Sequence, residues 1–218
     1  MSRTFIYIDG FNLYYRALKN TSHKWLDIVA LSRAALPSTC QIECVNYYTA
    51  DISGRTDPTA PARQQSYLRA LETLPQVRIF KGRFLASKKW AGLTQPPDFR
   101  PHFAVPSSVT LDVAHVWKTE EKGSDVNLGV HLVRDAFQGK FEQAAVLTND
   151  TDLVEAIRIV TQDVGLPVTL LAPNSQPSAS LQAVATSMRH INAYLGPCQL
   201  PDPVTRPNKP PIRKPANW

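Results

Sequence analysis

The sequence predicts an α/β fold in which helices cover both faces of a mainly parallel sheet. Three observations lead to this prediction. Short continuous apolar runs, typical of strands that are buried on both faces, recur along the chain. Segments with apolar residues at helical spacing separate these runs. The 218 residues, 43% of them hydrophobic, are enough to form one sizeable core.

The elements can be placed along the chain from these patterns. The predicted strands are residues 4–8, 42–49, 77–80, 144–148 and 168–171. The predicted helices are residues 26–35, 63–74, 125–137 and 152–164. The helix at 125–137 is predicted from four apolar residues that share one side, with Ser124 as its expected N-cap: Val126, Val130, Val133 and Phe137.

Composition excludes several classes of protein. No apolar run approaches the roughly 18 residues of a membrane span, so no membrane partner is expected. The first apolar run ends at Asp9, which makes it too short for a signal peptide. The three cysteines form no CxxC pair and no even-numbered framework. These features predict a reduced, cytoplasmic protein.

Charge and proline are unevenly distributed, although the net charge is +6. Residues 78–103 hold six basic residues against Asp98, and residues 196–218 hold four against Asp202. Prolines cluster in 96–106 and 197–215, which predicts a long internal loop and an extended, mobile tail. We therefore expect a domain at 1–195 and a basic proline-rich tail at 196–218.

Acidic residues follow the predicted strands. Asp9 follows the first strand directly, and Asp150 and Asp152 follow the strand at 144–148, while Asp125 opens a helix. Right-handed crossovers bring the carboxyl ends of parallel strands to one edge of the sheet, where ligands bind. Several carboxylates in one cleft repel one another unless a cation lies among them. Oxygen ligands favour Mg²⁺ or Mn²⁺, and such ions activate water and stabilise charge on a phosphoryl group.

A purely structural interpretation of these acids stays open. Asp is a common N-cap and turn residue, so Asp125, Asp150 and Asp152 could each simply begin a helix. Asp9 is harder to explain in this way, because apolar residues flank it and Gly10 allows a sharp turn or a close approach to a ligand.

Four motifs together carry a resemblance to a known family. They are residues 8–14 (IDGFNLY), 47–50 (YYTA), 118–128 (KTEEKGSDVNL) and 147–153 (LTNDTDL). In this order the motifs resemble the NYN domain family, a branch of the PIN-like nuclease superfamily, and above all its bacterial members. The resemblance covers roughly residues 4–195. It implies a three-layer α/β/α sandwich of Rossmann-like type.

The resemblance also implies metal-dependent hydrolysis of RNA. Carried over by position, the metal ligands and catalytic acids would be Asp9, Asp125, Asp150 and Asp152. Asn12 and Asn149 would orient a carboxylate, a water or a phosphate. Lys122 would counter phosphate charge, or it is a solvated lysine. The sequence departs from some relatives at His131, where they carry an acid. Asp135 could substitute for that acid, but we favour a solvent-facing residue there.

The basic segment has the composition of a single-strand binding surface, because cations suit phosphates and aromatic faces suit unstacked bases. Arg83, Lys88, Lys89 and Trp90 are its candidate RNA-binding residues. Phe80 and Phe84 are expected to belong to the core. The tail could contact nucleic acid, bind a protein partner in polyproline form, or simply be solvated. A homodimer is a further open alternative.

The leading hypothesis is therefore a metal-dependent ribonuclease. The alternative is an RNA-binding or scaffolding module of the same fold without catalysis. A phosphatase with an aspartyl-phosphate arrangement is disfavoured, because Phe11 stands where the second Asp is needed. A dinucleotide oxidoreductase is disfavoured because the nine glycines form no GxG, and the P-loop signature is also absent.

Overall fold

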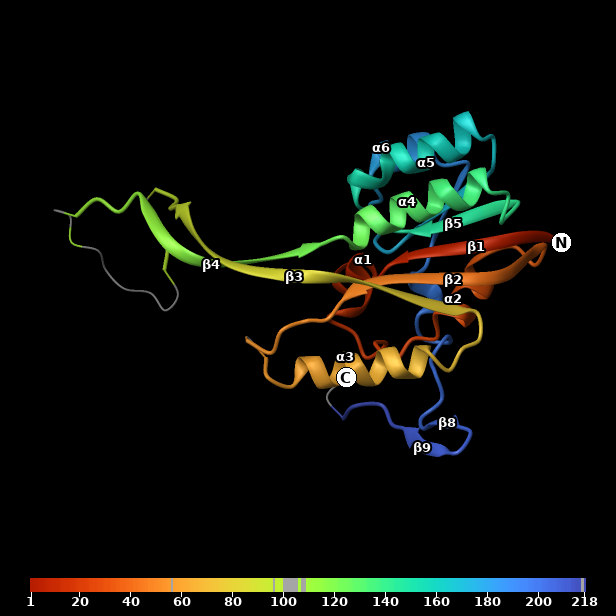
Figure 1. Ribbon diagram of the computed structural model, residues 1–218, viewed down its shortest axis with the longest axis horizontal. Helices are drawn as coiled ribbons and strands as arrows, with labels where there is room; N and C mark the ends of the chain where they lie inside the picture. Colours follow the sequence, from red (N-terminus) through yellow and green to blue (C-terminus); the bar gives the residue numbers. More distant parts are fainter. Residues whose placement is uncertain (56, 96, 100–105, 107–108, 217) are drawn as a thin grey trace.

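The predicted α/β fold is confirmed by the computed structural model, which describes residues 1–55, 57–95, 97–99, 106, 109–216 and 218. Within these residues the central sheet has seven strands in the order β4-β3-β2-β1-β5-β6-β7 (Figure 1). Neighbouring strands pair in parallel from β3 to β7, and β4 pairs antiparallel with β3. The strands are β1 (Ser2–Asp9), β2 (Cys40–Ala50), β3 (Val77–Gly92), β4 (Val113–Lys122), β5 (Gln143–Leu147), β6 (Val168–Ala172) and β7 (Ser187–His190).

Helices cover both faces of this sheet, as the alternation of patterns predicts (Figure 1). One face carries α1 (Gly10–Asn12), the π-helical η1 (Leu13–Leu18), α2 (Ile28–Ala35) and α3 (Ala60–Leu71). The other face carries α4 (Ser124–Phe137), the turn η2 (Thr151–Leu153), α5 (Val154–Arg158), η3 (Ile159–Asp163) and α6 (Ala179–Val184).

The core is divided by the sheet into two apolar clusters. β1 contributes to both, because alternate side chains of a strand point to opposite faces. Ile6 and Ile8 pack toward α2 and α3, whereas Phe5 and Tyr7 pack toward α4 and α5. This burial on both sides explains why the strand reads as a continuous apolar run and not as an alternating one. β1 and β2 are therefore rigid supports for whatever follows their ends.

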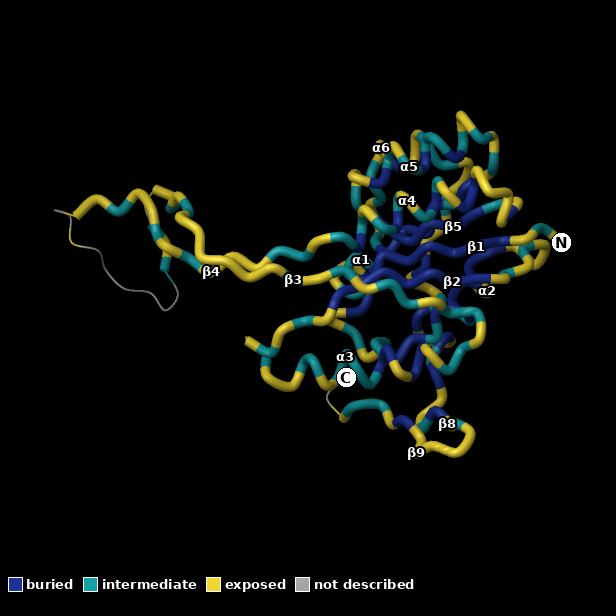
Figure 2. Tube along the Cα trace, in the orientation of Figure 1, coloured by how far each residue is buried: buried dark blue, intermediate teal, exposed yellow. Residues whose placement is uncertain are grey.

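β3 and β4 form an arm that leaves the body of the protein (Figure 1). Only the first part of β3 pairs with β2, from Val77 to Gly82. The rest pairs with β4 alone, from Arg83 opposite Lys122 to Gly92 opposite Val113. Most of this arm is exposed (Figure 2). The sequence predicted a strand only at 77–80, and most of the predicted loop at 96–106 lies outside the described residues.

For residues 196–218 the sequence predicts an extended tail without strand pairing, and this lack of pairing is wrong. β8 (Val204–Arg206) and β9 (Lys209–Ile212) pair as a small antiparallel sheet. Val204 and Ile212 are buried in the cluster that contains α2 and α3. Trp218 packs its ring against Trp25 and Tyr67, with centroids 6.1 and 5.3 Å apart. Burial of these apolar side chains outweighs the local effect of the prolines, whose positions here lie outside a central sheet.

The side of α4 that faces the core differs from the one predicted. Leu128, Leu132 and Ala136 are buried, whereas Val126 and Phe137 are 68% and 67% exposed. The helix has two apolar stripes, and the predicted one, with Val126 and Phe137, is not the one that faces the core. Ser124 is also not the N-cap. That position belongs to Gly123, with φ at 101°, and the Ser124 hydroxyl donates to Glu121.

Asp135 is buried, which corrects the expectation of a solvent-facing residue. It is 3% exposed and accepts hydrogen bonds from Tyr7 Oη at 3.0 Å, Arg134 Nη2 at 2.7 Å and Lys140 Nζ at 3.0 Å. Burial alone would raise the pKa of Asp135, but these hydrogen bonds outweigh it and lower the pKa below its ordinary value. The residue therefore ties α4 to β1 and plays no part in the site at the sheet edge.

His131 also has a structural role. Its Nδ1 lies 3.1 Å from the hydroxyl of Tyr48, and its ring meets Phe80 edge to face.

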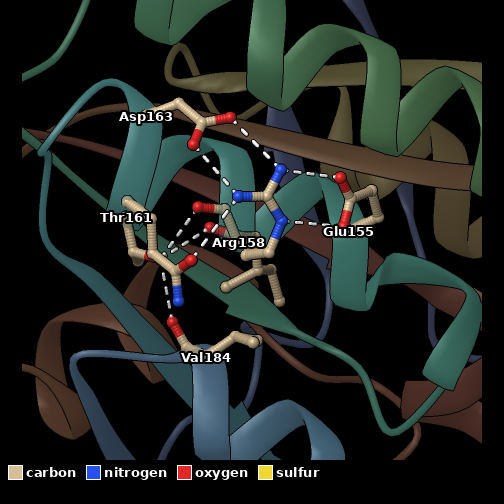
Figure 3. Close-up of polar contacts among 7 residues, drawn as sticks. Glu155, Arg158, Thr161, Asp163 and Val184 are labelled. Atoms are coloured by element: carbon tan, nitrogen blue, oxygen red, sulfur yellow. Dashed lines mark hydrogen bonds and ion pairs between the residues drawn. The ribbon is translucent and has the colours of Figure 1, made fainter.

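An ion cluster on α5 and η3 lies in the same layer of helices as α4. Arg158 pairs there with Glu155 and Asp163 (Figure 3). The hydroxyl of Thr161 donates to the carbonyl of Val184 at 3.0 Å and so joins η3 to α6.

In the part of the chain that the structure describes, no helix combines the length and the apolar character needed to cross a membrane.

Replacing Asp135 with Asn should lower the free energy of unfolding by about 1–2 kcal/mol at pH 7, because two charged hydrogen bonds are lost. The folded pKa of Asp135 is lowered, so its contribution is present above about pH 4 and disappears as the pH falls through the folded value. Urea denaturation at several pH values measures this. The difference between the two proteins should shrink at low pH. Glu43→Gln, at an exposed acid of β2 that forms no ion pair with the described residues, is the control, and an equal loss there would contradict the assignment.

Candidate active site

Asp9 is at the centre of the site, at the carboxyl end of β1. It is only 2% exposed. Its Oδ1 accepts from the backbone N–H of Asn12 at 2.9 Å, and its Oδ2 accepts from Asn12 Nδ2 at 2.6 Å and from the hydroxyl of Thr148 at 3.2 Å. Burial raises the pKa of Asp9 and these hydrogen bonds counteract the rise, while the nearby charge of Asp150 adds to it. Asn12 thus orients a carboxylate, as the resemblance implies.

The end of β5 lies beside Asp9, because β1 and β5 pair in parallel up to Ile8 and Leu147. The Thr148 hydroxyl, which donates to Asp9, accepts from the backbone N–H of Asp150 at 3.0 Å. Asp150 in turn caps η2 by accepting from the N–H of Asp152. The interpretation of Asp150 as a helix cap is therefore correct, but it does not exclude a second role, because each carboxylate has several acceptor sites.

Asn149 connects the site to the loop before α6. Its backbone N–H donates to Asn12 Oδ1 at 3.2 Å, and its side-chain Oδ1 accepts from the N–H of Ser178 at 2.7 Å. Its amide is therefore used to hold neighbouring chain segments. Through Asn12 it also stabilises the orientation of Asp9.

Asp125 joins this edge from the first turn of α4. Its pKa is raised to about 6 by burial first, and then by repulsion from Asp9, Asp150 and Glu121. Burial alone raises the pKa of a carboxyl group, and nearby negative charges raise it further. Glu121, at the end of β4, is held by the N–H and the hydroxyl of Ser124 at 3.1 and 2.8 Å. The structure therefore brings Asp9, Asp125 and Asp150 together, and it adds Glu121.

Two close backbone approaches place these acids. A Cβ on Gly10 would lie 2.7 Å from the carbonyl oxygen of Tyr48, so only glycine lets α1 start directly against β2. A Cβ on Gly82 would lie 2.7 Å from the carbonyl oxygen of Lys122 and 3.0 Å from the N–H of Ser124. Gly82 therefore allows the end of β4 and the start of α4 to pass close to β3, which brings Asp125 toward Asp9.

Sequence reasoning missed two members of this group, Glu121 and Thr148. Glu121 lies three residues before Ser124 in the 118–128 motif, a spacing at which a side chain can accept from a backbone N–H at a helix start. Thr148 ends the apolar run that leads to Asp150. Asp152, by contrast, is exposed, and its backbone N–H donates to Asp150.

The acids supply only oxygen donors, which is the chemistry that Mg²⁺ and Mn²⁺ prefer. The repulsion that Asp9, Asp150 and Glu121 add to the effect of burial on Asp125 is what a bound cation would relieve. Among the described residues, however, no group of three or more His, Cys, Asp or Glu is arranged to hold one ion. The oxygen donors therefore suit a divalent cation, but the side chains as they stand are not placed to bind one together.

The predicted RNA-binding residues are not in this cluster but on the arm. Lys88 and Lys89 are exposed there, with Lys88 Nζ 5.3 Å from the ring centroid of Trp117. Trp90 is 71% exposed and stacks on His115. Arg83 and Lys122 face each other in register where the arm meets the body. Lys122 is nearer the acids along the chain, and it pairs with Glu120 at 3.3 Å.

A cavity of about 490 Å³ adjoins the acid cluster. Gly10 and Phe11, which directly follow Asp9, form part of its wall, and Tyr47 and Thr49 of β2 form another part. Burial, with a smaller effect from the charge of Asp9, raises the pKa of Tyr47 above its ordinary value, so the phenol stays protonated. The predicted core position of Phe84 is only partly correct, because its half-buried ring also lines this cavity.

Comparisons with known proteins identify a relative by sequence and a solved structure with a similar fold. No family model matches the chain. A crystal structure of a protein of unknown function from Vibrio parahaemolyticus has a TM-score of 0.54 and 14% identity, and covers 87% of this chain and 93% of that one, so it supports the fold alone. The sequence is 30% identical to 6-hydroxy-3-succinoylpyridine 3-monooxygenase HspA from Pseudomonas putida, over 99% of this chain and 75% of that protein. That relative is an enzyme, and the chain belongs to its family, that of 6-hydroxy-3-succinoylpyridine 3-monooxygenase HspA.

Proposed function

We propose that this protein hydrolyses RNA phosphodiester bonds with a divalent cation held by its acid cluster. The observation that carries the proposal is the crowding of acids at one edge of the sheet, where burial first, and then the charges of Asp9, Asp150 and Glu121, raise the pKa of Asp125 to about 6. The resemblance of the motifs to the NYN domain family supports the same activity. Neither of the two similar proteins is named as a nuclease, so the proposal of a ribonuclease is supported by the acid cluster and the motifs alone.

The acid cluster favours catalysis over simple RNA binding. Placing several negative charges in one partly buried cleft costs free energy, and a phosphate approaching them would be repelled. A protein that only binds RNA gains nothing from this arrangement. In a protein that binds a divalent cation, the same carboxylates act as its ligands and their charge is neutralised.

Asp9, Asp125 and Asp150 would hold Mg²⁺ or Mn²⁺. When bound, such a cation supplies an activated water and stabilises negative charge at the phosphate. The protein supplies the orientation. Asn12 and Thr148 hold both oxygens of Asp9 and so fix the orientation of that carboxylate. The side-chain positions of Asp125 and Asp150 would adjust on binding, since no three ligands enclose an ion as they stand.

The arm would hold the RNA strand near these acids. Its exposed aromatic rings, Trp90 and Trp117, suit unstacked bases, and its lysines suit phosphates. The arm joins the body at Arg83 and Lys122, next to the start of α4. A strand that follows the arm inward therefore arrives beside Asp125.

A second candidate function is oxygenation of a substituted pyridine, and the observation that favours it is the relative that matches 99% of the chain. The lack of a GxG sequence disfavours only the oxidoreductase class with a glycine-rich dinucleotide turn. Incubation with 6-hydroxy-3-succinoylpyridine, dioxygen and a reduced nicotinamide or flavin tests this function directly. Turnover of that substrate that persists in Asp9→Asn, with no cleavage of RNA by either protein, would replace the ribonuclease proposal.

Asp9→Asn should abolish cleavage of single-stranded RNA in Mn²⁺ without unfolding the protein. Burial disfavours the charge at this position, so a neutral side chain of the same shape is tolerated. Mapping of end-labelled RNA on gels measures cleavage, and circular dichroism checks the fold. Asp163→Asn is the control and should cleave as the natural protein does. Native cleavage by Asp9→Asn would show that the acids are not the catalytic centre.

Mn²⁺ should raise the thermal unfolding temperature of the natural protein, because the cation binds the folded acid cluster in preference to the unfolded chain. Asp125→Asn should unfold at a higher temperature than the natural protein in chelator, since one repelling charge is removed. The same variant should gain less from Mn²⁺. Differential scanning calorimetry with and without chelator measures both effects. Equal gains in the two proteins would exclude Asp125 as a ligand.

Lys88→Ala and Lys89→Ala should each weaken binding of single-stranded RNA and reduce the salt dependence of the affinity by about one unit of log–log slope. Binding is measured by fluorescence anisotropy in chelator, which prevents cleavage. Arg189→Ala, on β7 at the opposite edge of the sheet, is the matched control. If the control lowers the slope as much as the two lysine variants do, the arm has no special role in binding.

A further inference from the structure

We propose that the cavity beside Asp9 binds one unstacked nucleotide of the RNA strand, with its base between aromatic rings and its phosphate on the cations at the rim. This inference rests on the proposed function and names a subsite for it. The cavity, of about 490 Å³, lies between α1 and η1 on one side and α3 on the other, and the base of the arm borders it through Phe84 and Thr119. This volume lies in the usual range for sites that enclose a small ligand, roughly 300–1,000 Å³.

The walls of the cavity are aromatic, and some of them are accessible. Phe11 lies 6.5 Å from Tyr15 in a stacked arrangement and meets Phe84 edge to face at 5.7 Å. Tyr15 is 59% exposed, which is unusual for a ring that serves only packing. Flat apolar faces at the mouth of a cavity are what an unstacked base needs, because stacking on aromatic side chains replaces stacking in the strand.

The charge of the cavity is positive. Lys19, Lys24, Arg55 and Arg63 line it, against the single acid Asp57 among the lining residues. Asp57 is already paired with Arg63 at 2.5 Å and holds it in place. Lys19 lies 5.2 Å from the ring centroid of Tyr15 and Arg55 lies over Trp117, but neither these two cations nor Lys24 form an ion pair with an acid among the described residues. Aromatic walls with a cationic rim fit an aromatic ligand that carries phosphate.

Arg55 connects the cavity to the arm. Its guanidinium lies 4.6 Å from the ring centroid of Trp117, on whose ring Lys88 also lies at 5.3 Å. One path of cations and rings therefore runs from the arm to the cavity. A ligand that used only the cavity would have no need for this path, whereas a strand would occupy both.

The position relative to the acids fits a nucleotide next to the scissile bond. Asp9 pairs with Tyr48 in register, and Tyr47 and Gly10 form the wall on that side. No acid of the cluster lines the cavity, but Gly10 and Phe11 of its wall directly follow Asp9 in the chain. A strand with one base in the cavity would therefore pass the end of β1 with its next phosphate. The amide of Gln64 is engaged at both ends, accepting from the N–H of Ile52 at 3.0 Å and donating to the carbonyl of Ala50 at 2.9 Å. We therefore expect little preference among the bases.

Binding of adenosine and cytidine 5′-monophosphates to the Asp9→Asn protein, measured by isothermal titration calorimetry in chelator, tests the proposal without cleavage. Tyr15→Ala and Arg55→Gln should each lower the affinity by about tenfold, since one removes a stacking face and the other a cation. Both side chains are exposed, so the fold should be retained. Phe137→Ala and Arg189→Ala, an exposed ring and an exposed cation elsewhere, are the matched controls and should bind as Asp9→Asn does.

The proposal is overturned if the nucleotides do not bind, if the controls lose as much affinity as the two cavity variants, or if the pyridine considered above binds the cavity while nucleotides do not. This result is separable from the ribonuclease proposal. Nucleotide binding that depends on Tyr15 and Arg55 supports the subsite even if the natural protein fails to cleave RNA. Cleavage that depends on Asp9 and is unchanged by Tyr15→Ala and Arg55→Gln supports the acids and rejects the subsite.

Discussion

β1 pairs in parallel with β2 on one side and with β5 on the other, and the rest of the site depends on this central position. Both faces of β1 are buried, so Asp9 at its end is carried into a region with little water. The register with β5 puts the hydroxyl of Thr148 within hydrogen-bonding distance of that carboxylate. The register with β2 puts Tyr47 and Tyr48 beside it, so one strand end borders both the acids and the cavity.

Opposite charges are separated in space. The acids gather at the sheet edge, where burial and mutual repulsion raise the pKa of Asp125, while exposed cations lie on the arm and at the rim of the cavity. Gly82 allows the two regions to meet, because its missing side chain lets the end of β4 pass against β3. An anionic ligand is attracted by the arm and is repelled by the acids until a cation neutralises them. Net charge alone does not reveal this arrangement.

Local sequence and tertiary packing disagree in three places for identifiable reasons. The helix at 124–137 has two apolar stripes, and packing on the sheet selects the one with Leu128 and Leu132. Asp135 has the local appearance of an exposed helical residue, but Tyr7 from β1 supplies a buried partner. The prolines of the last segment favour an extended chain locally, yet Val204 and Ile212 find apolar surface on the body. In each case the deciding contact comes from a segment distant in sequence.

The sequence by itself determined the parallel α/β fold and the position of Asp9 and Asp150 just after neighbouring strands, because continuous apolar runs mark buried strands and parallel strands end at one edge. Asp125 follows the antiparallel strand β4, so the tertiary structure decides its approach to these two acids. Only the tertiary structure decided that Glu121 and Thr148 join them, that β3 and β4 extend as an arm, and that a cavity opens beside Asp9. These features depend on strand register and on contacts between segments far apart in the chain. Local patterns of residues carry no information about such distances.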